Sequence, residues 1–298
     1  MAKINRPPVI YSPSSIQDLL RIYNLNKDAI IFAGGTKSLL NNEGDHLYMK
    51  GSVINLMGIE DLKKISRTDR YLELGATVTI SRILELGKSI VPKALYSALK
   101  QMGPPQIRNM ATIGGNVCVH ENRMDLFPLL HIHDAQIELR KQKDLRSARR
   151  LLKGDSKWIP ASRFINSEGK IILSPGEILT RIRVPNENWP YQSYTKTGEY
   201  SSPLIFAGLA NTDKYIISDF RICFSTSKEK TIRIRDLEAD LIGRRLPLSR
   251  KETSHVNVKI KETFQNLGET DFTIARAIAL TDQFIEKISD PIADEDIF

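Results

Sequence analysis

Two glycine pairs in this 298-residue chain stand where glycine backbones commonly bind phosphate. In IIFAGGTKSLL, residues 30–40, a strand-like apolar run stops at Gly34-Gly35 and a helix-compatible run begins at Lys37. A second pair, Gly114-Gly115, lies in QIRNMATIGGN. Glycine lets backbone amides approach phosphate oxygens without interference from Cβ, and successive amides form an anion-binding nest. Two such turns predict a long ligand, whereas either turn alone is equally typical of an ordinary tight turn.

Hydroxyl and amide side chains beside both glycine pairs fit a diphosphate that carries sugar hydroxyls. These side chains are Thr36, Ser38, Thr112 and Asn116. The first turn is not a P-loop, because Thr36 precedes Lys37 where that motif requires glycine. The chain also lacks the G-x-G-x-x-G pattern that follows a strand in dinucleotide-binding folds, and the G-x-S-x-G of a hydrolase.

Histidine and cysteine patterns give little support for a metal site. HENRM, residues 120–124, has Met124 where a zinc protease helix needs its second histidine. His131 and His133 would share one face of a strand, but no third ligand is evident, so a structural pair is the favoured interpretation. Two cysteines are too few for a disulfide framework or a four-thiolate site, which is typical of a reducing compartment.

The composition predicts a protein of the cytoplasm without a membrane span. No apolar run approaches the roughly 20 residues of such a span, and the N-terminus lacks a secretory pattern. Lys and Arg number 43 against 35 Asp and Glu, so the chain attracts acidic partners. The basic stretch at residues 140–154 lacks the interleaved aromatics of a nucleic-acid module. It is interpreted as a solvated face, with a partner surface as the alternative.

Apolar periodicity predicts a mixed chain of helices and strands. The predicted helices cover residues 15–25, 78–86, 91–102, 234–243 and 272–288. Strands are predicted at residues 28–33, 51–56, 71–76, 135–140, 170–174, 177–185, 203–210 and 215–226, the first of them short and buried. A Pro- and Asn-rich segment, VPNENWPYQ, predicts a domain boundary near residues 185–190, and the tail at residues 290–298 is expected to fray.

The order of several motifs resembles the FAD-binding medium subunit of molybdenum hydroxylases, the xanthine dehydrogenase and carbon monoxide dehydrogenase family. The motifs are FAGGTKSLL, QIRNMATIGGN, the acidic residue of MDLFPLL, LSPGEILTRIRVP, YTK and RIRDLEADLIGRRL. The resemblance implies an α+β fold: a two-subdomain FAD-binding domain of the PCMH, vanillyl-alcohol-oxidase-like type and a small α/β C-terminal domain of the CO dehydrogenase flavoprotein type. The implied domains are 1–187, with subdomains about 1–56 and 57–187, and 188–298.

The same resemblance implies FAD as cofactor and a set of residues around it. The first turn would wrap the diphosphate, the second would pack against the cofactor, Asp125 would hold a flavin hydroxyl, and Leu179 would pack on a ring. Lys196 would lie near the polar edge of the flavin. Ordinary roles are the alternatives: Asp125 as a helix cap, Leu179 as core and Lys196 as a solvated residue. The complete implied set is Ile31, Phe32, Ala33, Gly34, Gly35, Thr36, Lys37, Ser38, Met102, Thr112, Ile113, Gly114, Gly115, Asn116, Asp125, Leu179 and Lys196.

As an oxidoreductase subunit of this kind, the chain would take electrons from a 2Fe-2S small subunit, reduced in turn by a molybdenum-cofactor large subunit, and pass them to NAD or another acceptor. No side chain here need be a nucleophile or general base. The chain departs from the family at residues 119–124, VHENRM, where relatives carry small residues. That departure motivates a second hypothesis, a flavin-fold structural or assembly subunit; a nucleic-acid-binding protein, the third, rests on net charge alone.

Overall fold

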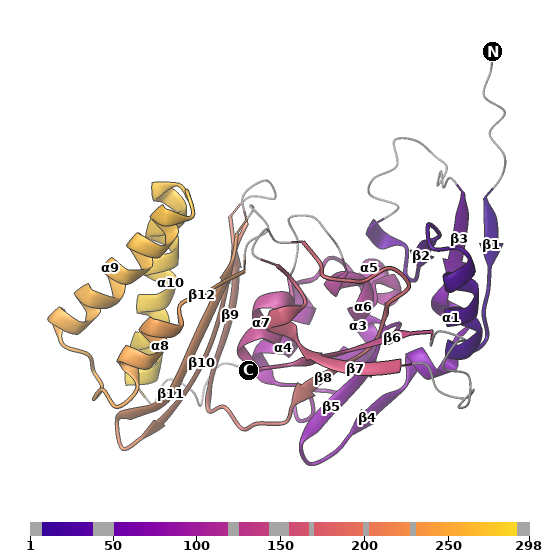
Figure 1. Ribbon diagram of the computed structural model, residues 1–298. Helices are drawn as coiled ribbons and strands as arrows, with labels where there is room; N and C mark the ends of the chain where they lie inside the picture. The colour runs from indigo at the N-terminus through magenta and orange to yellow at the C-terminus, as the bar shows by residue number, and fades with distance from the viewer. Residues whose placement is uncertain are drawn as a thin grey trace.

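The computed structural model describes residues 8–37, 51–118, 125–142, 155–166, 170–198, 203–226 and 231–290. These form three sheets and their helices, arranged in sequence order across the molecule (Figure 1). The N-terminal strands and α1 lie at one end, and α8, α9 and α10 lie at the other. None of the helices in the described ranges is long and apolar enough to span a membrane.

The helices alternate with strands in the first two thirds of the chain and are concentrated at its end. The helices are α1 (Ile16–Leu25), α3 (Ile80–Leu84), α4 (Lys93–Gln101), α5 (Pro105–Met110), α6 (Ile113–Val117), α7 (Phe127–Ile132), α8 (Arg235–Leu241), α9 (Arg250–Asn266) and α10 (Asp271–Ser289), with 3-10 turns η1 (Leu56–Gly58), η2 (Glu60–Lys63) and η4 (Ala161–Arg163). The strands are β1 (Val9–Tyr11), β2 (Ile30–Phe32), β3 (Ser52–Asn55), β4 (Ile65–Arg67), β5 (Tyr71–Gly75), β6 (Gln136–Lys141), β7 (Asp155–Pro160), β8 (Ile178–Pro185), β9 (Tyr191–Thr197), β10 (Leu204–Asp213), β11 (Ile216–Ser225) and β12 (Thr231–Arg233).

The N-terminal sheet is parallel, with strand order β1-β3-β2, and β2 leads directly into the first glycine turn. Helix α1 packs on it through Ile16, Leu19 and Leu20. The helix begins at Ile16 because the Ser15 side chain accepts a hydrogen bond from the Asp18 amide, as an N-cap does. The predicted helix is confirmed.

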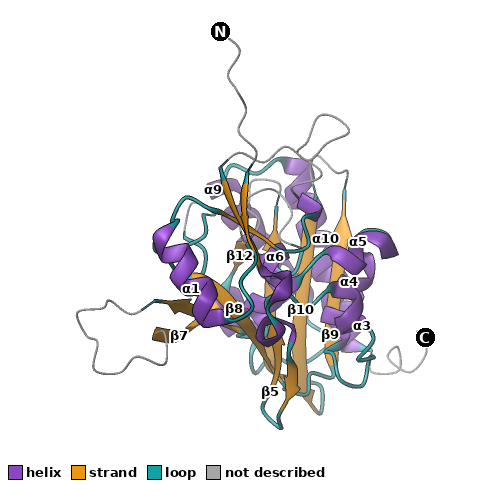
Figure 2. Ribbon diagram, turned by 90° about the vertical axis from the view of Figure 1, so that its right-hand side faces the viewer, coloured by secondary structure: helices purple, strands orange, loops and turns teal. Residues whose placement is uncertain are grey.

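The middle of the chain forms an antiparallel sheet of order β4-β5-β8-β6-β7 whose apolar face packs against α3, α4, α6 and α7. Ala135, Ile137 and Leu139 are all buried, as their alternation predicts. Helices α3, α4 and α5 lie close together (Figure 2). This sheet positions the second glycine turn, because the loop after β5 forms hydrogen bonds with the start of α6.

The C-terminal sheet, β12-β11-β10-β9, is antiparallel and has helices on both faces. Ile205, Ala207 and Leu209 share a core with α4 and α7, whereas Leu204 and Phe206 share one with α9 and α10. A strand buried on both faces has no polar side to alternate with. This explains why residues 203–210 form an almost continuous apolar run, and it confirms the predicted strand there.

Three local predictions were wrong. The strand at residues 28–33 exists as β2, but it is an edge strand whose Ile30 and Ile31 are exposed. Residues 170–174 form only an isolated bridge, Ile165 with Ile171, because the chain turns at Ser174 before β8 begins. His131 lies on α7, and His133 follows as its C-cap, so the pair does not sit on a strand.

The longest missed element is α9. Its apolar stripe consists only of Val256, Ile260 and Phe264, so periodicity alone is weak. The signal that predicts it is the capping box, in which Ser249 caps the Glu252 amide while the Glu252 carboxylate accepts from the Ser249 amide. The stretch at 119–124, most of the basic run at 140–154 and the tail at 291–298 lie outside the described residues.

Candidate functional site

The two glycine turns border one cleft. Its volume is about 570 Å³, within the range of small-molecule and cofactor sites. Residues from α1, the first turn, the second turn and the start of β8 meet there, although they are far apart in sequence. The lining residues are Tyr23, Ile31, Phe32, Ala33, Gly34, Gly35, Thr36, Lys37, Leu56, Ala76, Ala111, Thr112, Gly114, Gly115, Asn116, Cys118, Leu173, Glu177, Ile178 and Leu179.

The first turn presents unpaired backbone amides. Gly35 has a φ of +69°, a conformation that side chains rarely tolerate, and it connects β2 to the helical residues that begin at Thr36. Within the described part of the chain, the amides of Gly34 and Gly35 have no hydrogen-bond acceptor. Adjacent unpaired amides attract an anion, because their partial positive charges add.

The second turn uses its amides internally. Ile113 N–H donates to Val78 O at 3.0 Å and Gly114 N–H donates to Ala76 O at 2.9 Å. Gly115 N–H donates to the Thr112 hydroxyl at 3.1 Å, so Thr112 caps the short helix α6. The backbone of this turn is therefore fixed before any ligand arrives.

One polar atom of the second turn remains without a partner. The Asn116 side-chain oxygen is buried and accepts no hydrogen bond from the described residues, and Asn116 lines the cleft. A buried acceptor without a donor costs about 1–3 kcal/mol. A ligand hydroxyl or amide in the cleft would remove that cost.

The turns are pressed against each other through glycine. A Cβ atom added at Gly34 would lie 1.8 Å from the Met110 carbonyl oxygen and 3.3 Å from Ala111 Cα. Both of those residues directly precede the second turn. Because only glycine permits this approach, Gly34 sets the distance between the two walls of the cleft.

The start of β8 supplies another wall. Leu179 is 4% exposed, lines the cleft and also belongs to the central core. Beside it, the Glu177 carboxylate accepts from Lys157 Nζ at 2.5 Å and from the Ser174 amide at 2.9 Å. Burial raises the pKa of Glu177, but these hydrogen bonds outweigh it, and the pKa lies below its ordinary value. Glu177 is therefore a fixed, paired carboxylate.

Asp125 and Lys196 form an ion pair outside the residues that line the cleft. Lys196 Nζ donates to Asp125 Oδ1 at 2.7 Å, so neither the helix cap nor the solvated lysine is observed. The Tyr194 hydroxyl, on the same strand, is buried without a described partner. Burial and the Asp125 charge raise the Tyr194 pKa. The contribution of Asp125 and Lys196 to a flavin site stays a prediction.

The remaining predicted site residues fall into three groups. Ile31 through Lys37, Thr112, Gly114, Gly115, Asn116 and Leu179 line the cleft. Met102 and Ile113 are buried in the central core behind it. Ser38 lies outside the described residues.

Several lining residues were not predicted. Glu177 and Ile178 adjoin Leu179 in sequence, and Cys118 lies two residues after Asn116, so an extended motif would have included them. Burial raises the Cys118 pKa to about 12. Tyr23 reaches the cleft from α1, and no local sequence signal indicates this.

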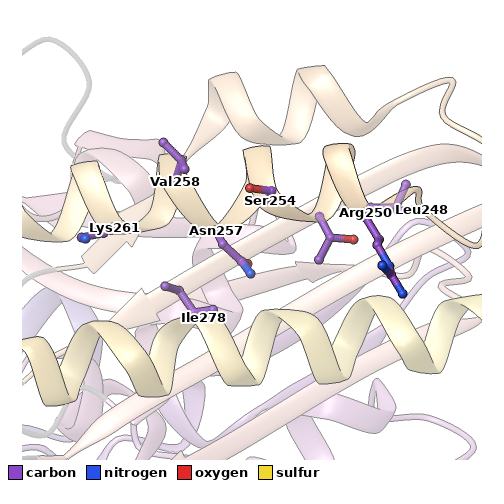
Figure 3. Close-up of a pocket in the computed structure, with 8 residues that line it drawn as sticks. Leu248, Arg250, Ser254, Asn257, Val258, Lys261 and Ile278 are labelled. Carbon is purple, nitrogen blue, oxygen red and sulfur yellow. The ribbon is translucent and has the colours of Figure 1, made fainter.

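A separate groove of about 470 Å³ lies between α9 and α10 (Figure 3). Asn257 on α9 and Ile278 on α10 point toward each other across it, with Arg250 at one end and Lys261 farther along α9. It shares no residue with the cleft. Among the described residues, no group of three or more His, Cys, Asp or Glu side chains could hold a metal ion.

Comparison with known families identifies the part of the chain that contains the cleft. Residues 3–187 match the family described as FAD binding domain in molybdopterin dehydrogenase. The chain belongs to this family. The match contains both glycine turns and Leu179, and it confirms the resemblance that the sequence motifs carry and FAD as the cofactor.

Curated relatives agree with the family. The FAD-binding subunit of xanthine dehydrogenase from Escherichia coli O157:H7 is 27% identical over 176 residues, covering 58% of this chain and 56% of the relative. Xanthine dehydrogenase 2 from Arabidopsis thaliana is 25% identical over 261 residues, 78% of this chain and 18% of that protein. The chain thus spans about half of the first relative and much less of the second.

Solved structures share the fold over nearly the whole chain. Quinoline 2-oxidoreductase from Pseudomonas putida 86 contains a chain with a TM-score of 0.77 at 18% identity, covering 96% of this chain and 98% of that one. Carbon monoxide dehydrogenase from Hydrogenophaga pseudoflava gives 0.76 at 20% identity, covering 96% of each chain. These neighbours confirm the α+β fold class, including the C-terminal sheet and helices beyond residue 187.

The residues of the cleft fit FAD. The unpaired amides of Gly34 and Gly35 suit a diphosphate, the orphaned Asn116 oxygen suits a hydroxyl or ring N–H, and Leu179 gives an apolar surface for a ring. Among the described residues that line the cleft, Glu177 alone carries a carboxylate, and it is already paired with Lys157. Repulsion of a diphosphate by that carboxylate is reduced accordingly.

Proposed function

We propose that this chain is the FAD-binding electron-transfer subunit of a multi-subunit molybdenum hydroxylase of the xanthine dehydrogenase type. It would receive electrons from a 2Fe-2S subunit, which a molybdenum-cofactor subunit reduces, and pass them to NAD or another acceptor. The observation that carries the proposal is the convergence of both glycine turns and Leu179 on one cleft within the family match. When bound, FAD supplies the redox chemistry.

The protein's own part is to bind and orient. Gly34 and Gly35 donate amide N–H groups to the diphosphate, and Asn116 accepts from a cofactor donor. Leu179 excludes water from one wall. The Asp125–Lys196 pair would fix a cofactor hydroxyl and place a positive charge near the cofactor's polar edge, which favours a reduced, anionic ring.

The first experiment is a visible absorbance spectrum of the purified chain before and after FAD is added. The proposal expects the absorbance bands of oxidised protein-bound flavin, with FAD and not FMN released on denaturation, because the amide nest recognises a diphosphate bridge. FMN lacks that bridge and is the matched control ligand. A colourless chain that takes up neither flavin, alone or with its partner subunits, would contradict the proposal.

Electron transfer is tested separately from binding. Anaerobic addition of NADH to the FAD-loaded chain should bleach the flavin bands if NAD is the acceptor in the forward direction, since hydride transfer is reversible. Reduction by a reduced 2Fe-2S partner without reaction with NADH would support another acceptor. FAD that binds but is reduced by neither would favour the structural or assembly subunit.

A further inference from the structure

A second cavity, of about 310 Å³, lies between the middle of the chain and the C-terminal unit. Phe127 and His131 on α7 and Ser162 on η4 form one side, and Thr231 and Arg233 on β12 form the other. It shares no lining residue with the flavin cleft. Its size suits a ligand with a compact ring or short aliphatic body.

Hydrogen-bond donors of this cavity remain unused. The Thr231 hydroxyl is buried and has no partner among the described residues. The Ser162 hydroxyl and His131 Nε2 also lack a hydrogen-bond partner within the described ranges, although each residue lines the cavity. A buried hydroxyl is almost always paired in folded proteins, so the Thr231 hydroxyl indicates a ligand that accepts from it, whereas Ser162 and His131 are half-buried and can contact water.

Arg233 contributes charge on one edge only. Its Nε donates to both Glu238 oxygens, at 2.9 and 3.1 Å, and Nη1 donates to the His131 carbonyl and to Asp134. Nη2 has no acceptor in the described part of the chain. The carboxylates therefore neutralise the far edge of the guanidinium, and no Asp or Glu is among the described residues that line the cavity.

His131 is held neutral. Burial, with the charges of Arg233 and Arg235, lowers its pKa to about 4. The Cys223 sulfur lies 3.7 Å from Nδ1, and burial keeps that thiol protonated by raising its pKa. The thiol donates to the Phe224 carbonyl oxygen at 3.8 Å, so its contact with Nδ1 does not select one tautomer of the neutral ring.

We infer that this cavity binds a small organic carboxylate, with its oxygens on Arg233 Nη2 and the Thr231 hydroxyl, and its carbon body against Phe127 and Ile232. The unpaired donors select an anion. The apolar side chains select a carboxylate with a hydrocarbon body over inorganic phosphate. The site is independent of the flavin cleft, so it does not depend on the proposed function.

The test is calorimetric titration of the full-length chain with benzoate, and then with inorganic phosphate, at neutral pH. One benzoate per chain is expected, and Thr231→Val should weaken it about fivefold, the effect of one lost hydrogen bond. Thr253→Val, the same change in the groove between α9 and α10, should leave the affinity unchanged. Without benzoate, Thr231→Val should be as stable as the unaltered chain, because it removes a hydroxyl that has no partner.

Three outcomes would overturn the inference. The first is an absence of saturable binding up to about 10 mM benzoate. The second is equal affinity in the unaltered chain and in Thr231→Val. The third is phosphate binding more tightly than benzoate, which would remove the hydrocarbon body from the assignment. Displacement of benzoate by FAD would place it in the flavin cleft and also contradict the inference.

Discussion

Gly34-Gly35 and Gly114-Gly115 border the same cleft, but their backbones are engaged differently. The first pair leaves its amides without acceptors in the described structure and bends through the positive φ of Gly35. In the second pair, the Gly114 amide donates to the Ala76 carbonyl and the Gly115 amide donates to the Thr112 hydroxyl. The same Gly-Gly pair thus leaves amides available at one turn and permits close packing at the other.

Close packing explains the second glycine pair. A Cβ atom at Gly114 would lie 2.7 Å from the Ala76 carbonyl oxygen and 2.9 Å from the Ala76 Cβ. Glycine is required there so that α6 can approach the loop after β5. The second turn then presents a side chain, Asn116, to the cleft instead of its backbone.

The largest effect is expected for Gly34→Ala, which should force the two glycine turns apart. The new Cβ would overlap the Met110 carbonyl oxygen, so the backbone must shift. We expect the free energy of unfolding to fall by about 3 kcal/mol and FAD affinity to fall about a hundredfold. Chemical denaturation and FAD titration measure the two quantities.

Gly87→Ala is the matched control for that change. Gly87 has a φ of +81°, but no atom lies within 4 Å of its added Cβ. The free energy of unfolding should fall by about 1 kcal/mol, because alanine disfavours the left-handed backbone conformation, while FAD affinity stays unchanged. Equal FAD loss in both variants would show that general destabilisation, and not the spacing of the turns, controls the cofactor.

Acidification should lower the free energy of unfolding through two buried histidines. Burial is the main cause that lowers the pKa of both His131 and His133 to about 4, from an ordinary 6.5. Below pH 6.5 the unfolded chain binds protons that the folded chain excludes, so stability falls as pH decreases toward 4. Between pH 7 and pH 5.5 we expect a loss of about 2 kcal/mol for the two histidines.

The measurement is urea denaturation of the chain across that pH interval. His133→Leu should flatten part of the slope, because it removes one of the two titrating groups. The change breaks no hydrogen bond, since the ring nitrogens have no partner in the described structure. A slope that this variant leaves unchanged would contradict the assignment of His133 to the pH dependence.

Asn116→Ala tests whether the second turn contacts FAD through its side chain. Because its oxygen has no described protein partner, the cofactor-free chain should change little in stability. FAD affinity should fall about tenfold with the loss of a buried hydrogen bond, measured by flavin fluorescence. Asn109→Ala, on the exposed helix α5, should leave affinity unchanged; the same loss there would argue against a direct contact.

The smallest effect is expected for Thr112→Val. It removes the cap on Gly115 N–H and should cost about 1 kcal/mol, a fall of a few degrees in Tm. FAD affinity should change less than in Asn116→Ala, because Thr112 acts through the backbone. A greater loss of affinity than in Asn116→Ala would show that the second turn contacts the cofactor through this hydroxyl.

Local signals predicted much of the fold. The apolar spacing of Ile16, Leu19 and Leu20 places α1 correctly, since periodicity is a property of a few neighbouring residues. The exposure of β2 could not be predicted, because an apolar tripeptide looks the same at the edge of a sheet and at its centre. Apolar periodicity does not indicate helix α9, because its buried stripe is narrow, although the capping box at Ser249 marks its start.

The site shows the same division. The order of two glycine turns, with a matching segment that contains β8, was enough to determine the family and its cofactor, because each of these motifs is a run of contiguous residues. Contacts between distant segments determine which amides stay unpaired, which carboxylate pairs with Lys157 and which side chains meet across the second cavity. Only the tertiary structure decides these, since hydrogen-bond partners compete across the whole fold.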